Sequence, residues 1–281
     1  MSQEPAAYGR TDLTYNDYLK VDELLRLQVP QSEPAHHDEM LFIVIHQAYE
    51  LWFKLILHEL AKAIEHMDAG EVLRARHFVE RVVEIQKLLV KQIHILETMA
   101  PAEFLQFRHR LMPASGFQSV QFRELEFMCG LKDRRYLAFF TSSPELCARL
   151  ERVLAARDLR TAYYDMLRRL DFELPPDISV EALRADDVAR DQLFRALLPV
   201  YRDPGLNLPL YLLTESLVSL DAQLGLWREH HVRVVERIIG FKRGTGGSSG
   251  VGYLQSTTQK KCFPFLWEIR TVLEVEPESL R

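Results

Sequence analysis

Apolar residues recur along this chain with helical spacing in nearly every segment, and no convincing series of alternating apolar and polar residues predicts strands. Two long helices are expected, over about 36–67 and 71–99, and the Asp68-Ala-Gly turn would pack them as an antiparallel hairpin. Further helices are expected over about 208–240 and 259–273. We therefore predict an all-α protein, a single large helical domain with long antiparallel core helices.

A short amphipathic helix is expected near the N-terminus. Thr14 followed by Asp17 is typical of a capped helix start, and Tyr15, Tyr18 and Leu19 then lie on one face. The segment VPQSEP ends this helix, because proline does not fit a helix interior. Such a helix docks on its own subunit or, as the alternative, on a neighbouring chain.

Another short helix is expected to begin at Pro101 and to end at a turn of proline and small residues, MPASGFQS. Phe104, Arg108 and Leu111 share one side of it. An arginine beside aromatic residues can hold a carboxylate through two parallel hydrogen bonds, although a surface salt bridge is the more ordinary interpretation. Residues 119–205 predict shorter helices and carry no evident chemistry.

The composition limits the class of protein. With 281 residues, 47% of them hydrophobic, the chain can bury a substantial core. A net charge of −5 offers no basic surface, so we expect no nucleic-acid partner. Residues 1–12 are polar, do not resemble a secretory signal and are expected to be disordered. No uninterrupted apolar run reaches the roughly 20 residues that span a membrane, and three widely spaced cysteines indicate reduced thiols. We expect a cytoplasmic protein that does not bind membranes.

Two adjacent histidines lie near the end of the helix over 208–240, and only one of them can face inward. His231 shares its stripe with apolar residues, among them Trp227, whereas His230 shares its stripe with polar residues and is expected to face solvent. A buried imidazole needs a partner. That partner is a backbone carbonyl in the ordinary case, and a metal ion is the alternative.

A further histidine, His46, follows the turn 41–45 in the most apolar helix, and we expect that turn to be buried on every side. The histidines with charged neighbours at helical spacing are expected at the surface, namely His58, His66, His77 and His94.

The glycine-rich segment GTGGSSG does not predict a phosphate-binding loop, because it follows a helix and has no Lys-Ser/Thr ending. Either it approaches a ligand closely with its backbone or the Thr245 hydroxyl, or it is a flexible connector. A zinc-protease motif fails at Lys62, four residues after His58, and a di-iron motif has only one Glu-x-x-His. What remains is two inward-facing histidines without a carboxylate cluster. Two histidines suffice to bind haem, because the protein then has to supply only an axial nitrogen and a distal group.

Three segments carry a family resemblance: SEPAHHDEMLFIVIHQAYELWFK, PASGFQSVQFRELE and IIGFKRGTGGSSGVGYL. They closely resemble the tryptophan 2,3-dioxygenase family, whose members are haem enzymes that open the indole ring of L-tryptophan. The resemblance runs from about residue 13 to 273 and is weak over about 141–199. It implies a haem b that is ferrous in the active form, O2 as co-substrate, and N-formyl-L-kynurenine as product, the first step of the kynurenine pathway.

The resemblance also implies roles for individual residues. His231 matches the proximal haem ligand, and His46 matches the distal histidine that hydrogen-bonds the indole N–H and is catalytic. Phe42 matches a residue packed against haem and indole, and Arg108 and Thr245 match contacts to the amino-acid end of tryptophan. The remaining matches are haem-side residues Ser115, Gly116 and Trp227, and substrate-side Phe104, where some bacterial members carry tyrosine.

The N-terminal helix also matches a feature of the family. Tyr15, Tyr18 and Leu19 match residues inserted into the pocket of a neighbouring subunit, so residues 13–30 would be exchanged within a homotetramer that is a dimer of dimers. Two other functional classes stay open from the sequence. An indoleamine-type dioxygenase would also accept D-tryptophan, and a non-enzymatic haem sensor of O2 would need no carboxylate clamp.

Overall fold

The computed structural model describes residues 12–246 and 249–273, and within them every regular element is helical. The all-α prediction is therefore confirmed. Disorder is expected over residues 1–12. Of these, residues 1–11 lie outside the described part of the chain. The elements, with η for 3-10 helices, are α1 (Tyr15–Leu19), α2 (Val21–Leu24), α3 (His37–Asp68), α4 (Val72–Leu96), α5 (Pro101–Arg108), η1 (His109–Leu111), η2 (Gly116–Gln118), α6 (Val120–Met128), η3 (Arg134–Phe140), α7 (Pro144–Ala155), α8 (Leu159–Arg169), α9 (Val180–Ala185), α10 (Asp187–Arg202), α11 (Leu208–Ile239), α12 (Val251–Thr257), α13 (Pro264–Glu268) and η4 (Ile269–Val272).

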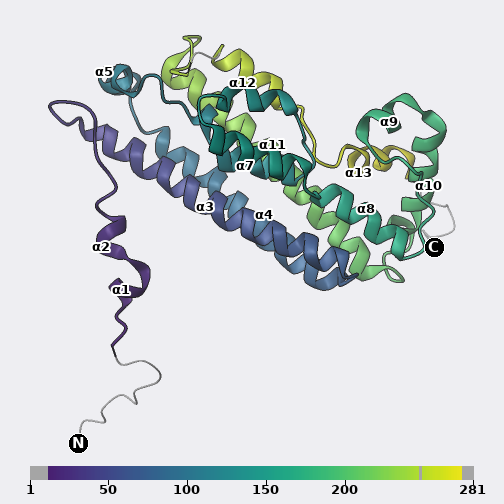
Figure 1. The fold of residues 1–281 in the computed structure, drawn as a ribbon. Coiled ribbons are helices and arrows are strands. Elements are labelled where there is room, and N and C mark those ends of the chain that lie inside the picture. The colour runs from purple at the N-terminus through teal and green to yellow at the C-terminus, as the bar shows by residue number, and fades with distance from the viewer. Residues whose placement is uncertain (1–11, 247–248, 274–281) are drawn as a thin grey trace, which may run out of the picture.

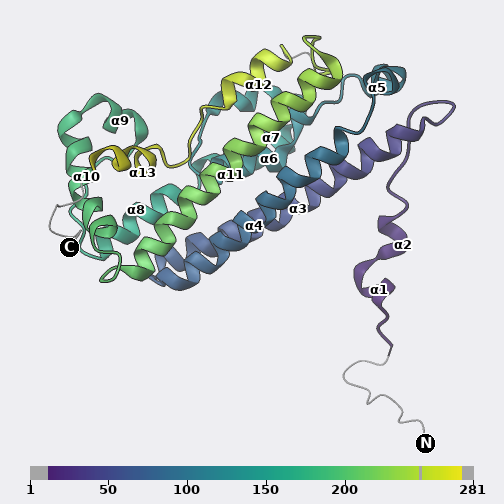
Figure 2. The ribbon, with the colours of Figure 1, turned by 180° about the vertical axis from the view of Figure 1, so that it is seen from behind.

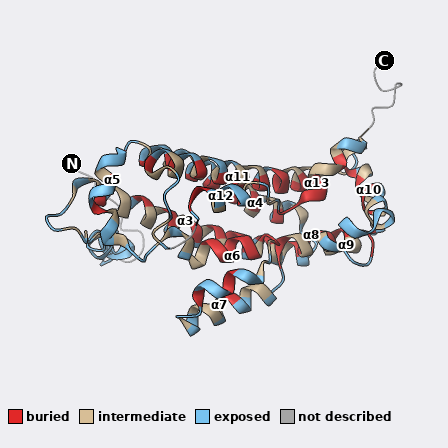
Figure 3. Cartoon of the chain, turned by 90° about the horizontal axis from the view of Figure 1, so that it is seen from above, coloured by how far each residue is buried: buried red, intermediate tan, exposed pale blue. Residues whose placement is uncertain are grey.

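Three long helices form the frame of the molecule. Helices α3 and α4 make the predicted antiparallel hairpin, and α11 packs along α4 over much of its length (Figures 1 and 2). The turn between α3 and α4 contains Gly70 at φ +74°, a backbone conformation that glycine adopts without steric cost. Buried residues line the facing sides of α3, α6 and α11 (Figure 3).

Helix α3 buries one face, along which Ile45, Tyr49, Phe53, Ile56 and Leu60 follow one another at three- and four-residue spacing. The expectation that turn 41–45 is buried on every side is wrong. Val44 is 46% exposed, and the residues before it are half-buried. This end of α3 is covered on one side only, because α1 and α2 extend away from the helical body (Figure 1).

By length and composition, α3 is also the one helix of the described residues that could cross a membrane. It packs against α4, α6 and α8 and carries two buried glutamates, Glu39 and Glu59. A long core helix passes the same test of length and composition.

The C-terminal part differs from the prediction of one helix over 259–273. Helix α12 ends at Thr257 and α13 begins at Pro264, with a non-helical segment between them. The carboxylate of Asp221, on α11, accepts hydrogen bonds from the backbone N–H of Cys262 (2.8 Å) and Phe263 (3.1 Å). It also accepts one from the indole N–H of Trp267 (3.0 Å). These N–H groups bond to a buried carboxylate instead of to a helix, which explains the interruption.

Replacing Asp221 with alanine should lower the free energy of unfolding by about 3–5 kcal/mol, because these donors lose a charged acceptor in a buried place. Urea denaturation measures the effect. The matched control is Glu84→Ala, which removes an exposed carboxylate paired with Lys87 and should change stability by less than about 0.5 kcal/mol. Equal effects of the two substitutions would contradict the structural role of Asp221.

Candidate active site

A cavity of about 250 Å³ lies between α3, α4, α5 and α11, near the glycine-rich loop. We call it the central cavity. All the predicted haem-side and substrate-side residues outside the N-terminal helix line it: Phe42, His46, Phe104, Arg108, Ser115, Gly116, Trp227, His231 and Thr245. Residues separated by up to about two hundred positions in the sequence thus share one enclosed space.

One side of the central cavity carries His46, on α3. Its Nδ1 lies 2.7 Å from the carbonyl oxygen of Phe42, one turn earlier, so that nitrogen carries the proton and donates. Burial lowers the pKa of His46 below the ordinary histidine value. The ring is therefore neutral at pH 7, and its Nε2 is an acceptor available to a ligand N–H group.

His231 projects into the same cavity from α11. Burial lowers its pKa to about 4, and the nearby His46 contributes a smaller decrease. The imidazole stacks on Trp227 at 5.1 Å between ring centroids and makes no hydrogen bond to any residue that the structure describes. A neutral imidazole that lacks a hydrogen-bond partner has a nitrogen lone pair free to bind a metal ion. The alternative of a core histidine bonded to a carbonyl does not hold.

Aromatic rings form a second wall of the cavity. Phe42 lies 4.0 Å from the His46 ring and stacks on Phe104 at 5.6 Å between centroids. Phe107 meets Phe42 and Phe104 edge to face. Phe104 and Phe107 belong to α5, which packs on α3 and α11, so a short helix brings both rings to the N-terminal half of α3. The wall suits a flat aromatic ligand.

Polar groups gather where the glycine-rich loop meets α5 and the turn after it. The Arg108 guanidinium donates a hydrogen bond to the carbonyl oxygen of Arg243, and the Thr245 hydroxyl donates one to the carbonyl oxygen of Ala114 (2.6 Å). A Cβ on Gly246 would lie only 2.7 Å from Cβ of Ser115, so glycine is required for this close approach. The described residues of the loop therefore lie against the turn after α5, which favours the interpretation that the loop approaches a ligand.

Sequence reasoning missed a buried charged group at the cavity wall, formed by Arg123, Glu126 and Arg228. Glu126 binds both arginines, at 2.6 Å from Arg228. All three side chains are buried, and the Nε atoms of both arginines have no hydrogen-bond partner among the described residues. Two guanidinium groups against one carboxylate leave an excess positive charge. Such a wall suits an anionic group in the cavity. Arg228 lies about a hundred residues from the other two in the sequence, which hid this group from sequence reasoning.

The N-terminal residues do not reach this chain's own cavity. Tyr15, Tyr18 and Leu19 are 74%, 72% and 45% exposed, and the Thr14 side chain caps α1 as expected. Docking of α1 on its own subunit is therefore not observed. Their insertion into a neighbouring subunit stays a prediction.

Comparison with known proteins gives consistent matches. A family model described as tryptophan 2,3-dioxygenase matches residues 2–161 and 188–273. The tryptophan 2,3-dioxygenase of Caulobacter vibrioides is 46% identical over 262 residues, covering 93% of this chain and 99% of that protein. That of Xanthomonas campestris pv. campestris is 44% identical over 264 residues, covering 94% and 89%. The gap in the family match falls within the stretch where the resemblance is weak.

The low pKa of His231 predicts a pH dependence of stability. Between pH 6.5 and about 4 the unfolded chain protonates this imidazole and the folded chain does not, so folding stability falls as pH decreases through that window. The loss from this residue should reach about 3 kcal/mol. The variant His231→Gln cannot titrate, so its stability should decline less between pH 7 and pH 4. Urea unfolding of protein freed of bound small molecules tests this, and an equal decline in both proteins would refute it.

Proposed function

This chain belongs to the tryptophan 2,3-dioxygenase family, and on that basis we propose that it cleaves the indole C2–C3 bond of L-tryptophan with O2. The product would be N-formyl-L-kynurenine, as in the first step of the kynurenine pathway. One observation carries the proposal: His46 and His231 share a cavity with aromatic walls, and Arg108 and Thr245 line the same cavity.

The residues present fit a haem b. His231 offers an unpaired, unprotonated nitrogen as the axial ligand, and Trp227 stacks against its ring. Arg123 and Arg228 provide the excess positive charge that the haem carboxylates require, and Ser115 and Gly116 line the same cavity. When bound and in the ferrous form, the haem would supply the iron at which O2 reacts.

The chain's own task is to orient tryptophan. His46 presents Nε2 as an acceptor, because Nδ1 is committed to the carbonyl of Phe42, and the indole N–H is the matching donor. Phe42 and Phe104 enclose the indole ring. Phenylalanine at 104 offers no hydroxyl to the substrate, so binding of the carboxylate depends on Arg108. Positioning of this kind lowers the barrier without a protein nucleophile.

Arg108 and Thr245 would change partners when tryptophan binds. Both now bind backbone carbonyl groups, Arg108 that of Arg243 and Thr245 that of Ala114. A substrate carboxylate is a stronger acceptor for a guanidinium group than a neutral carbonyl. Gly246 lies close to Ser115, so closure of this loop over bound tryptophan would help to exclude water from the cavity.

We further propose a cytoplasmic homotetramer, a dimer of dimers, that acts without nucleic acid or membrane. The exposed apolar residues of the N-terminal segment support exchange of this segment between subunits: Leu13, Tyr15, Tyr18, Leu19, Leu24, Leu25, Leu27 and Val29. A half-covered α3 offers an apolar surface to receive a partner, with Met40, Val44 and Leu51 exposed.

A comparison of substrates tests the proposed reaction. With O2 and reductant-primed enzyme, L-tryptophan should give the absorbance of N-formylkynurenine, and D-tryptophan should be much poorer. Comparable rates for both enantiomers would favour the indoleamine-type dioxygenase. Absence of product from either, with haem bound, would favour the sensor of O2.

The variant Arg108→Ala should reduce kcat/KM for L-tryptophan roughly 30-fold to several thousandfold, mostly through a higher KM. This factor corresponds to a loss of about 2–5 kcal/mol in interaction free energy. Tryptamine, which lacks the carboxylate, should be turned over equally poorly by both proteins. The matched control Arg110→Ala changes an exposed arginine two residues away and should have little effect. An unchanged KM for L-tryptophan in Arg108→Ala would remove this role.

A further inference from the structure

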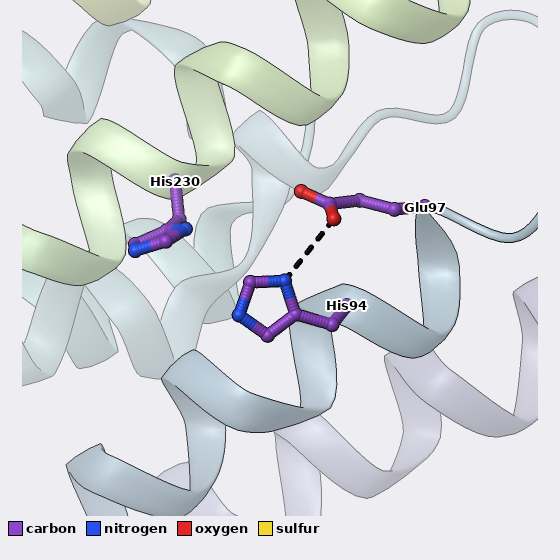
Figure 4. A group of neighbouring side chains, drawn as sticks. All are labelled: His94, Glu97 and His230. Atoms are coloured by element: carbon purple, nitrogen blue, oxygen red, sulfur yellow. Dashed lines mark hydrogen bonds and ion pairs between the residues drawn. The ribbon is translucent and has the colours of Figure 1, made fainter.

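Outside the central cavity, three potential metal ligands converge on the surface between α4 and α11. His94 and Glu97 come from the last turn of α4 and the residue after it, and His230 comes from α11 (Figure 4). One ligand atom from each residue lies within 4.8 Å of the others. The expectation that His230 simply faces solvent is therefore wrong: it is half-buried, and its ring meets that of His94 edge to face at 5.2 Å.

We propose that the His94–Glu97–His230 group binds a divalent transition-metal ion of the zinc class. Two imidazole nitrogens and one carboxylate oxygen form a ligand set that zinc accepts, and a water molecule would complete a tetrahedral site. Magnesium and calcium prefer oxygen ligands alone, so they should not compete. The inference does not rest on the proposed dioxygenase function.

The geometry requires only small movements of side chains. Ligand atoms around a tetrahedral zinc ion lie about 3.4 Å apart, given bond lengths near 2.1 Å. The Nδ1 of His94 is already 3.1 Å from a carboxylate oxygen of Glu97, so His230 has to approach that pair. The His94 side chain is 53% exposed and free to rotate, whereas α4 and α11 pack tightly and hold the backbone in place.

An ordinary ion pair does not explain the arrangement. An exposed pair between His94 and Glu97, three residues apart on one helix, contributes little to stability and needs no third residue. His230 comes from another helix and makes no hydrogen bond to either of them. A shared metal ion gives all three side chains a common partner.

The proposed metal site lies next to the central cavity. None of its three ligands lines that cavity, but Ile93, Leu96 and His231, each adjacent in sequence to a ligand, do. A bound ion would therefore join α4 to α11 directly behind the cavity wall, at the level of His231.

The test uses the untagged, full-length protein with its natural cofactor content, stripped of loosely bound metal with a chelator. Equilibrium dialysis against zinc chloride should give one zinc per chain at about 10 µM free zinc. The variants His94→Ala, Glu97→Gln and His230→Ala should each weaken binding at least about tenfold, since even indirect metal contacts contribute that much. His77→Ala is the matched control, because it removes an exposed histidine of α4 outside the group, and it should bind zinc like the wild type.

Zinc K-edge X-ray absorption identifies the ligands independently of haem iron. A spectrum that shows two imidazole ligands and only nitrogen and oxygen atoms at about 2.0–2.1 Å from the zinc ion would support the site. A sulfur shell at about 2.3 Å would place the ion on cysteine and overturn the proposal. Less than one zinc per chain, or equal binding by the wild type and all three ligand variants, would also overturn it.

Discussion

The central feature of this structure is an imidazole that faces a cavity with aromatic walls and has no hydrogen-bond partner among the described residues. His231 is in that position, and burial holds its pKa near 4, so the ring stays neutral. His46, in the same cavity, has one nitrogen committed to the Phe42 carbonyl and the other free. Folding of this chain therefore leaves two imidazole nitrogens that face the central cavity and that a ligand can bind.

The three long helices and the C-terminal segment maintain this arrangement. Helices α3 and α11 carry the two histidines, and α4 packs against both. Asp221, on α11, fixes the segment after α12, and Arg228 donates a hydrogen bond to the carbonyl of Lys260 in that segment. The residues that hold the ligands are thus tied to the core through buried hydrogen bonds, which limits how far the cavity can relax.

Much of this could be predicted from sequence, and the failures have physical causes. Helical periodicity predicted the long helices closely, and the apolar stripe of His231 predicted its inward orientation, because both depend on local spacing. The buried Arg123–Glu126–Arg228 group could not be predicted, since it depends on which distant helices meet. The break before Pro264 depends likewise on a long-range bond to Asp221. The exposed Val44 shows that a wholly apolar turn does not reveal whether its own chain or another covers it.

The absorption spectrum of the dithionite-reduced protein, recorded before and after L-tryptophan and air are added, shows whether His231 binds a haem iron that is active on tryptophan. We expect a haem Soret band in the wild type, growth of N-formylkynurenine absorbance once air is admitted, and loss of stable haem binding in His231→Ala. A wild-type protein without a Soret band after reconstitution with haemin, or a normal haem spectrum in His231→Ala, would contradict the assignment of His231 as the iron ligand.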